Sequence, residues 1–313
     1  MMNKDFLRIS NLTPDEGWEI IERAKDIKTR HLNKIPYMPM KGKTLAMIFE
    51  KPSTRTRVSF EVGIYQLGGM GLYLSANDLQ LSRGETVADT ARTLSGYVDM
   101  IMIRAFSQAM VEELAHHASI PVINGLTDLL HPCQVMSDVY TVAEARGGSL
   151  KDLTVVYIGD GNNLANSWIN AAALFGFNLR LACPKELAAD QEIFNAGKSK
   201  LGDRLTVVHD PIAAMEGAEI IYTDTWVSMG QDAERKKKLE LLKGYQVNDE
   251  LISAAPAGVK VMHCLPAHRG EEITDAVMDG KNSIVFLQAH NRLHVQKAIM
   301  DILSERMDKI GEK

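Results

Sequence analysis

The most constraining feature of this chain is an alternation of short apolar runs, rich in β-branched residues, with longer amphipathic stretches. Such runs predict strands, and the stretches between them predict helices. This alternation is typical of parallel α/β sheets. The expected strands of the first half are 44–49, 71–74, 99–103 and 121–124. Those of the second half are 153–158, 179–182, 205–208, 220–223, 260–263 and 284–287. Two sets of strands predict two doubly wound domains.

The length of 313 residues also suits two domains. We expect the joint between them at a helix over about 132–146, which Gly147 and Gly148 would end. The stretch 291–310, rich in Met, Leu and Lys, predicts a final helix. The residues alone leave open which domain that helix packs on.

Composition excludes several classes of protein. A net charge of −5 is unfavourable for binding a nucleic-acid backbone. Cys133, Cys183 and Cys264 are odd in number and far apart, which argues against a disulfide framework or a zinc site and favours a reducing compartment. Residues 1–10 lack a long apolar stretch and no run of 18 apolar residues occurs, so we expect neither a signal peptide nor a membrane span but a cytoplasmic protein.

Polar clusters directly follow the expected strands. In the first half they are 50–57, 77–80, Arg104 and 131–134; in the second half they are 159–163, 224–230 and 263–266. Ligands of open α/β sheets bind outside the carboxyl ends of strands. If the carboxyl ends of the two sheets face each other, an interdomain cleft results, and we expect this cleft to be the active site, with one substrate on each wall.

The segment 51–57, Lys-Pro-Ser-Thr-Arg-Thr-Arg, predicts an anion site. Ser53 is a good N-cap for a helix reaching about residue 67, and the free N–H groups and positive dipole end of that helix favour a bound anion. Arg55 adds a planar guanidinium group, whose N–H donors can bind two phosphate oxygens at once. Arg57 lies about 200° further around the helix and is expected to serve another contact. The alternative, a solvated basic helix start, explains less well why the hydroxyls of three residues gather here: Ser53, Thr54 and Thr56.

Two nucleotide-binding motifs are incomplete. Residues 42–44, Gly-Lys-Thr, resemble the end of a P-loop, but Tyr37 occupies the position of the required upstream glycine. Gly159 and Gly161 follow a strand as in dinucleotide-binding folds, but the third glycine is missing from 163–165. Neither a P-loop nucleotide site nor a nicotinamide cofactor is therefore expected.

His131 and Cys264 each allow two interpretations. His131 precedes Pro132 at an expected helix start, so its ring either faces a ligand, to which it can donate a hydrogen bond, or is structural. Gln134, on the first turn, can contact an amide-like group. Cys264 is either a nucleophile or a buried small hydrophobe, and Asp224 is its natural partner, because a carboxylate and a sulfur can together hold an amine.

These motifs, taken in order, resemble the aspartate and ornithine transcarbamoylase family over about residues 7–310. Ser-Thr-Arg-Thr-Arg at 53–57, followed by Ser-Phe-Glu at 59–61, is similar to the family's carbamoyl phosphate signature, and His-Pro-Cys-Gln at 131–134 to its second such motif. Asp224 with Ser-Met-Gly at 228–230, and His-Cys-Leu-Pro at 263–266, resemble the ornithine-specific branch. The chain departs from the family at His290, where a glutamate usually precedes Asn-Arg.

The resemblance implies a carbamoyl phosphate domain at 1–146, joined by a returning C-terminal helix at 291–313, and an ornithine domain at 147–290. It implies transfer of a carbamoyl group to the δ-amine of L-ornithine, giving citrulline in arginine metabolism, and a homotrimer or assembly of trimers with shared sites. The implied carbamoyl phosphate residues are Ser53, Thr54, Arg55, Thr56, Gln80, Arg104, His131, Pro132, Cys133, Gln134, Cys264, Leu265 and Arg292. The implied ornithine residues are Asn163, Asp224, Ser228 and Met229, and the implied catalytic residues are Arg104, His131, Asp224 and Cys264.

The implied chemistry needs neither a metal nor an organic cofactor, and no set of residues with metal-ligand spacing occurs in the sequence. Two alternatives stay open: a transcarbamoylase for another acceptor, such as putrescine, an acylated ornithine or aspartate, and a catalytically silent paralogue that binds ligands. The Ser-Met-Gly segment at 228–230 favours ornithine.

Overall fold

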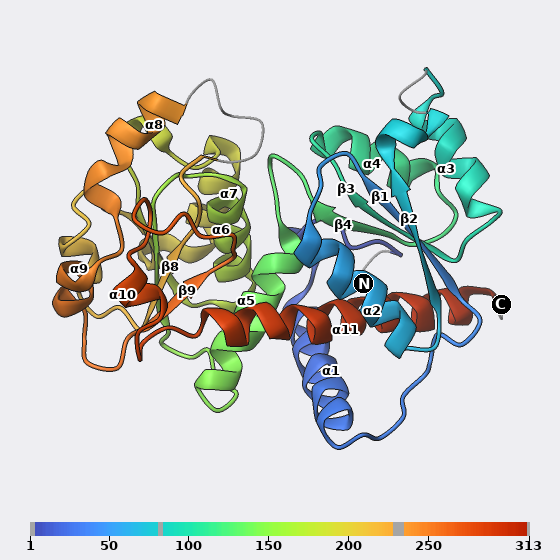
Figure 1. Ribbon diagram of the computed structural model, residues 1–313, viewed down its shortest axis with the longest axis horizontal. Helices are drawn as coiled ribbons and strands as arrows, with labels where there is room; N and C mark the ends of the chain where they lie inside the picture. The colour runs from blue at the N-terminus through green and yellow to red at the C-terminus, as the bar shows by residue number, and fades with distance from the viewer. Residues whose placement is uncertain (1–3, 81–83, 228–234, 312–313) are drawn as a thin grey trace. The chain divides into compact units, whose positions relative to one another are not determined.

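The computed structural model describes residues 4–80, 84–227 and 235–311. The chain divides into two compact units, one of Met1–Tyr140 with Asn291–Lys313 and the other of Thr141–His290. Each unit is built on one parallel sheet with helices around it (Figure 1), as the alternation of apolar runs predicts. Among the described residues, none of the helices is long and apolar enough to cross a membrane.

The first unit contains a four-stranded sheet in the order β2-β1-β3-β4, with every neighbouring pair parallel. Its strands are β1 (Thr44–Phe49), β2 (Met70–Ser75), β3 (Met100–Arg104) and β4 (Val122–Leu126). Its helices are α1 (Pro14–Leu32), α2 (Thr54–Gln66), α3 (Val87–Ser95) and α4 (Gln108–His117), with α5 (Pro132–Ala145) beginning in this unit. Strands β1, β3 and β4 are almost wholly buried, which explains their continuous apolar runs.

The second unit contains a five-stranded parallel sheet in the order β7-β6-β5-β8-β9. Its strands are β5 (Thr154–Ile158), β6 (Asn178–Ala182), β7 (Leu205–Val207), β8 (Ile220–Thr223) and β9 (Lys260–His263). Its helices are α6 (Asn163–Phe175), α7 (Gln191–Leu201), α8 (Arg235–Leu242), α9 (Asp249–Ala254) and α10 (Asp275–Met278). Three large aromatic side chains pack in its interior, with the ring centroid of Tyr222 5.9 Å from that of Tyr157 and 5.2 Å from that of Trp168.

The expected strand at 284–287 is wrong. Helix α11 (Val285–Gly311) begins there, six residues before the expected start of the final helix, and only Ser283 makes a β-bridge, to Val261. A run of four apolar residues fits a strand and the first turn of a helix equally well. In the helix, Val285 is buried in the core of the second unit while Phe286 is 54% exposed.

From Asn291 onwards α11 belongs to the first unit. Arg23 donates to Asp301 at 2.6 Å, and Lys28 donates to Asn291 at 2.8 Å. Gly63 of α2 leaves room for the side chains of α11, because a Cβ atom there would lie 3.2 Å from Cε of Met300. The final helix therefore returns to the first unit, as expected, and lies against α1 and α2.

Candidate active site

The register of each sheet brings the predicted polar clusters together. In the first unit, Phe49 at the end of β1 pairs with Arg104 at the end of β3, and Arg104 pairs with Leu126 at the end of β4. The segments after these strands therefore start from one edge of the sheet. In both sheets consecutive strands run outwards in opposite directions from a central pair, β1 with β3 and β5 with β8, and such a switch point is where α/β sheets bind ligands.

The start of α2 presents several hydrogen-bond donors and hydroxyl groups. Ser53 has an extended backbone and is the N-cap, and its Oγ accepts a hydrogen bond from the backbone N–H of Thr56 at 3.2 Å. The other N–H groups of the first turn lack helical acceptors, as at every helix start, so they are available to an anion. The side chain of Thr56 is fully buried, and its Oγ1 accepts a hydrogen bond from Nη2 of Arg292 at 2.9 Å.

His131 lies next to three arginines. Burial of its ring, together with the positive charges of Arg292, Arg104 and Arg55, holds the pKa of His131 well below its usual value. Because the ring is neutral at physiological pH, it can donate one hydrogen bond while the arginines supply the positive charge. These four residues come from α11, β3, α2 and the start of α5, so the fold gathers in one place what the sequence separates widely.

Gln134 and Cys133, on the first turn of α5, are buried. Gln134 donates from Nε2 to Asp138 at 2.9 Å, while its buried Oε1 accepts no hydrogen bond from any residue that the structure describes. That oxygen is an available acceptor for an N–H donor such as the amino group of a carbamoyl ligand.

Cys133 donates from Sγ to the backbone oxygen of Asn124 at 3.3 Å, and burial raises the pKa of its thiol to about 12. The side chain of Cys133 therefore packs in the interior and shapes the first turn of α5, where its backbone lies beside Gln134.

Arg57 and Gln80 lie apart from this cluster of buried groups. Arg57 is exposed, pairs with Glu61 at 3.3 Å, and its guanidinium carbon lies 4.0 Å from the ring centroid of Tyr73. It therefore serves a different contact from Arg55, as the helical spacing predicts. Gln80 is exposed beyond the end of β2.

The second unit gathers another polar cluster at one edge of its sheet. Ile158 of β5 pairs with Thr223 of β8, which pairs with His263 of β9. The residues that follow these three strands therefore lie at the same edge of the sheet. Asp224, buried directly after β8, is the centre of the cluster. Its Oδ1 accepts hydrogen bonds from Sγ of Cys264 and from the backbone N–H of Thr225, both at 2.7 Å.

Asn162 lies in the polar cluster 159–163, but the sequence motifs assign it no role. It is the N-cap of α6, where its Oδ1 accepts a hydrogen bond from the N–H of Leu164 at 2.8 Å. Its Nδ2 donates to Oδ2 of Asp224 at 2.7 Å. The available signal was its position immediately before a helical run, which favours Asn as an N-cap. Asn163, the predicted ligand, is the first residue of α6 and is half-buried.

A buried pair supports the segment that carries Cys264. Nδ1 of His263 accepts a hydrogen bond from the backbone N–H of Leu265 at 2.8 Å, so the ring proton lies on Nε2, which donates to Oε1 of Glu272 at 3.0 Å. Both side chains are almost fully buried. Leu265 adopts a positive φ of 60°. The His263–Glu272 pair thus holds in place an unusual backbone conformation beside Cys264.

Ser228 and Met229, which complete the predicted ornithine set, lie outside the described residues. Further along the chain, the buried Lys238 of α8 pairs with Asp160 at 2.5 Å.

Among the described residues, the side chains of His268, Glu271 and Glu272 are the one group spaced so that it could hold a metal ion. Glu271 already pairs with Arg235 and Glu272 accepts from His263, so both carboxylates have donors within the protein.

Comparisons with known proteins cover both units. A family model described as aspartate/ornithine carbamoyltransferase, carbamoyl-P binding domain, matches residues 4–144, and one described as aspartate/ornithine carbamoyltransferase, Asp/Orn binding domain, matches residues 151–303. Ornithine carbamoyltransferase of Syntrophus aciditrophicus is 54% identical over 302 residues, covering 96% of this chain and all of the relative.

Solved structures of ornithine carbamoyltransferases superpose closely on this chain. Ornithine carbamoyltransferase from Pyrococcus furiosus superposes with a TM-score of 0.91 at 48% identity, over 95% of each chain. The anabolic ornithine carbamoyltransferase from Campylobacter jejuni superposes with a TM-score of 0.89 at 37% identity, covering 97% of this chain and all of that one.

Proposed function

Because the chain belongs to the aspartate/ornithine carbamoyltransferase family, we propose that it transfers the carbamoyl group of carbamoyl phosphate to the δ-amine of L-ornithine, releasing citrulline and phosphate. The observation that carries this proposal is that each matched domain contains a cluster suited to its substrate. The carbamoyl-P part has a helix start with three arginines around a neutral histidine. The Asp/Orn part has a buried carboxylate bonded to a thiol and an amide.

The first cluster holds carbamoyl phosphate. The N–H groups at the start of α2, the hydroxyls of its first residues and two arginines bind the phosphoryl oxygens, because they offer several donors and positive charge to a dianion. Gln134 accepts a hydrogen bond from the carbamoyl amino group. The residues assigned to this substrate are Ser53, Thr54, Arg55, Thr56, Gln80, Arg104, His131, Pro132, Cys133, Gln134, Cys264, Leu265 and Arg292.

Arg104, His131 and Thr56 stabilise the carbamoyl oxygen as it gains negative charge. The neutral ring of His131 donates one hydrogen bond, and Arg104 supplies a cation. A well-placed donor of this kind stabilises the transition state by roughly 3–4 kcal/mol. The departing phosphate stays bound by Arg55, Arg292 and the helix start, so the leaving group is stabilised as its charge develops.

The second cluster holds ornithine, and the residues assigned to it are Asn163, Asp224, Ser228 and Met229. The δ-amine resembles that of lysine, with a pKa of about 10.4, so it is mostly protonated in water. Asp224 binds and orients the amine. Asn162 and Cys264, which both bond to Asp224, hold its carboxylate in position.

The transfer is direct. The δ-ammonium of ornithine first loses one proton to solvent. The lone pair of the neutral δ-nitrogen then forms a bond to the carbamoyl carbon, and a tetrahedral intermediate results. The bond from carbon to the phosphate oxygen then breaks, and the amine proton passes to the departing phosphate. Both substrates must therefore be bound at the same time, and holding them in place removes up to roughly 7–11 kcal/mol of barrier in ideal cases.

The proposed assembly is a homotrimer, or an assembly of trimers, with shared sites. Strand β2 is an edge strand whose apolar residues Met70, Leu72 and Tyr73 are exposed, and the neighbouring helix α2 exposes Val58 and Val62. An apolar edge of this kind is normally covered by a partner, and in a ring of three copies a different face of the neighbouring copy covers it. Gln80, which follows β2, would then reach a neighbouring subunit's site.

The proposed compartment is the cytoplasm. All three cysteines are free thiols, a state that a reducing compartment preserves. No disulfide contributes to the stability of the chain.

A colorimetric assay of ureido products tests the proposed activity. The purified protein, given carbamoyl phosphate, is expected to convert ornithine at least a hundredfold more efficiently than putrescine, N-acetylornithine or aspartate. Such selectivity requires about 2.7 kcal/mol of differential binding in the transition state. Preference for another acceptor would reassign the substrate, and binding without phosphate release from any acceptor would indicate a silent paralogue.

A further inference from the structure

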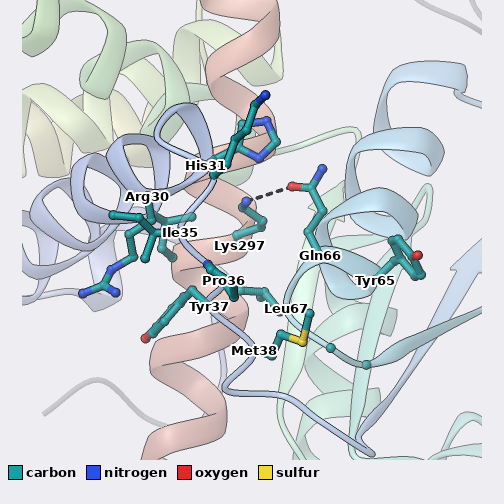
Figure 2. A pocket seen from close by; sticks show the side chains of 14 residues that line it. Arg30, His31, Ile35, Pro36, Tyr37, Met38, Tyr65, Gln66, Leu67 and Lys297 are labelled. Atoms are coloured by element: carbon teal, nitrogen blue, oxygen red, sulfur yellow. Dashed lines mark hydrogen bonds between the residues drawn. The ribbon is translucent and has the colours of Figure 1, made fainter.

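A cavity of the first unit lies away from the start of α2. Its volume is about 460 Å³, within the range of small-molecule sites. Figure 2 shows its walls, which come from the end of α1 and the segment after it, from the end of α2, and from α11. No residue of the proposed active site lines it.

The walls of this cavity carry only positive formal charge. Arg30, Lys34 and Lys297 supply this charge, the imidazole of His31 lies beside them, and no acidic residue lines the cavity. Arg30 is partly neutralised by Asp26, which lies 2.6 Å from it and outside the lining. The side chains of His31 and Lys34 are exposed and can turn towards a ligand.

Lys297 is the central feature. It is 3% exposed, and its Nζ donates to Oε1 of Gln66 at 2.9 Å (Figure 2). Within the described part of the chain, no carboxylate lies within 4.0 Å of that Nζ. Burial lowers the pKa of Lys297 to about 8. A buried ammonium with only a neutral acceptor is unfavourable, and an anion beside it would remove that cost.

The remaining walls are apolar. Ile35, Pro36, Met38 and Leu67 line the cavity together with the ring of Tyr37, whose hydroxyl donates to Asp301 at 2.7 Å. The cavity therefore offers a cationic end and an apolar body. This combination fits a small organic anion better than it fits an inorganic one.

We propose that this cavity binds a small organic anion, a carboxylate or phosphate monoester with a compact apolar body, and that its occupancy alters the affinity for carbamoyl phosphate. The second half of the proposal rests on the proposed function. The binding half does not, because it follows from the cavity and its charges alone.

Two elements connect the cavity to the proposed substrate site. Helix α11 carries Arg292, which donates to Thr56, and Lys297, which lines the cavity. Helix α2 begins at the anion site and ends in the cavity wall at Gln66. The two helices pack tightly at Gly63, where a Cβ atom would lie 3.3 Å from Cγ of Lys297. A ligand that pairs with Lys297 therefore acts on a side chain packed against both helices, and a coupling between the sites follows.

Isothermal titration calorimetry of the full-length protein tests binding, with benzoate and phenyl phosphate as the two probes. At least one probe is expected to bind with one cavity site per chain, and any phenyl phosphate bound in addition at the start of α2 is expected to be lost in Arg55→Ala. The affinity at the cavity site should fall about tenfold or more in Lys297→Met, since a charged hydrogen bond is lost. It should be unchanged in Lys309→Met, an exposed lysine of the same helix that pairs with Glu305, and in Arg55→Ala, which removes a group of the proposed active site.

Circular dichroism verifies that each variant is folded, and Lys34→Ala, at an exposed position, provides a second variant should Lys297→Met fail to fold. Lys34→Ala is expected to weaken the probe about threefold. The proposal is overturned if neither probe binds, or if binding is lost in Arg55→Ala and retained in Lys297→Met or Lys34→Ala. Binding of phenyl phosphate alone would assign the site to phosphate monoesters, and binding of benzoate alone to carboxylates.

Steady-state assays test the coupling. A saturating probe is expected to change KM for carbamoyl phosphate at least threefold in wild type and Lys309→Met, with no effect in Lys297→Met. An unchanged KM would overturn the coupling while leaving the binding site intact. A protein that binds the probe through Lys297 but makes no citrulline would refute the proposed function and leave the cavity's assignment standing.

Discussion

At the scale of single residues, the environment of His131 determines its protonation. The buried ring faces three cationic side chains, and its pKa lies well below the usual value. In the unfolded chain the pKa of histidine is about 6.5. The folded protein therefore stays unprotonated at His131 at pH values where the unfolded chain binds a proton.

This difference predicts a pH dependence of stability. As pH falls below about 6.5, His131 binds a proton in the unfolded state but not in the folded state, so the free energy of unfolding decreases. His131→Asn should remove this contribution, and the loss of stability between pH 7.5 and pH 5.0 should be smaller than in wild type by about 1–2 kcal/mol. Urea unfolding at the two pH values measures it. Equal losses in both proteins would show that His131 titrates normally in the fold.

Cys264 is expected to hold the carboxylate of Asp224 in position rather than to act as a nucleophile on the carbamoyl carbon. Its Sγ donates to Asp224, and a serine hydroxyl can make the same bond. Cys264→Ser should therefore keep turnover within about a hundredfold of wild type, whereas loss of a true nucleophile costs about a millionfold. Mass spectrometry of the wild-type protein, quenched during turnover, supplies the complementary measurement: a carbamoylated Cys264 would refute direct transfer.

The sequence could indicate which residue types the site uses, but not how they are held. The hydroxyls and Arg55 at 53–56 could be recognised because a helix start and its ligands are contiguous in sequence. The link between Asn162 and Asp224, and the support of Leu265 by His263 and Glu272, depend on strand register, which local patterns do not specify.

At the scale of elements, the turn between β5 and α6 depends on Gly161. A Cβ atom at this position would lie 2.5 Å from the backbone oxygen of Leu187, and the neighbouring contacts are also backbone atoms, which cannot move aside easily. The N–H of Gly161 donates to that same oxygen at 2.8 Å. The close approach of the two segments therefore requires glycine.

Gly161→Ala is expected to displace Asn162 and Asn163, because they are the next residues of the turn. Overpacking of this kind costs roughly 1–3 kcal/mol of stability. KM for ornithine should rise about tenfold, while the affinity for carbamoyl phosphate, measured by calorimetry without ornithine, should stay near that of wild type. Gly244→Ala, where a Cβ atom meets nothing within 4 Å, is the matched control. Equal ornithine kinetics in the two variants would argue against a role for this turn.

The elements themselves were largely predictable. The strands at 44–49, 71–74, 99–103, 121–124, 153–158, 179–182, 205–208, 220–223 and 260–263 are confirmed to within two residues. They were found because buried parallel strands give continuous apolar runs. The run at 284–287 has the same composition but begins α11, and only its tertiary setting distinguishes the two.

At the scale of the whole molecule, the exposed apolar residues of α2 and β2 predict self-association. Val62→Glu is expected to weaken the trimer, because a charge would be buried at each copy of the contact. Size-exclusion chromatography with light scattering should show trimers for wild type and smaller species for the variant. Val207→Glu, at a similarly exposed valine of the edge strand β7, is the control and should stay trimeric. A monomeric wild type would contradict the assembly.

Each unit is proposed to bind one substrate, and a molecule that joins both substrates tests this assignment. Titration calorimetry with N-(phosphonoacetyl)-L-ornithine should show binding at least a hundredfold tighter than ornithine alone, since one molecule then uses both clusters. Arg55→Ala in the first unit and Asp224→Asn in the second should each weaken that binding by at least tenfold. If either variant binds the compound as tightly as wild type, its cluster does not hold a substrate and the account fails.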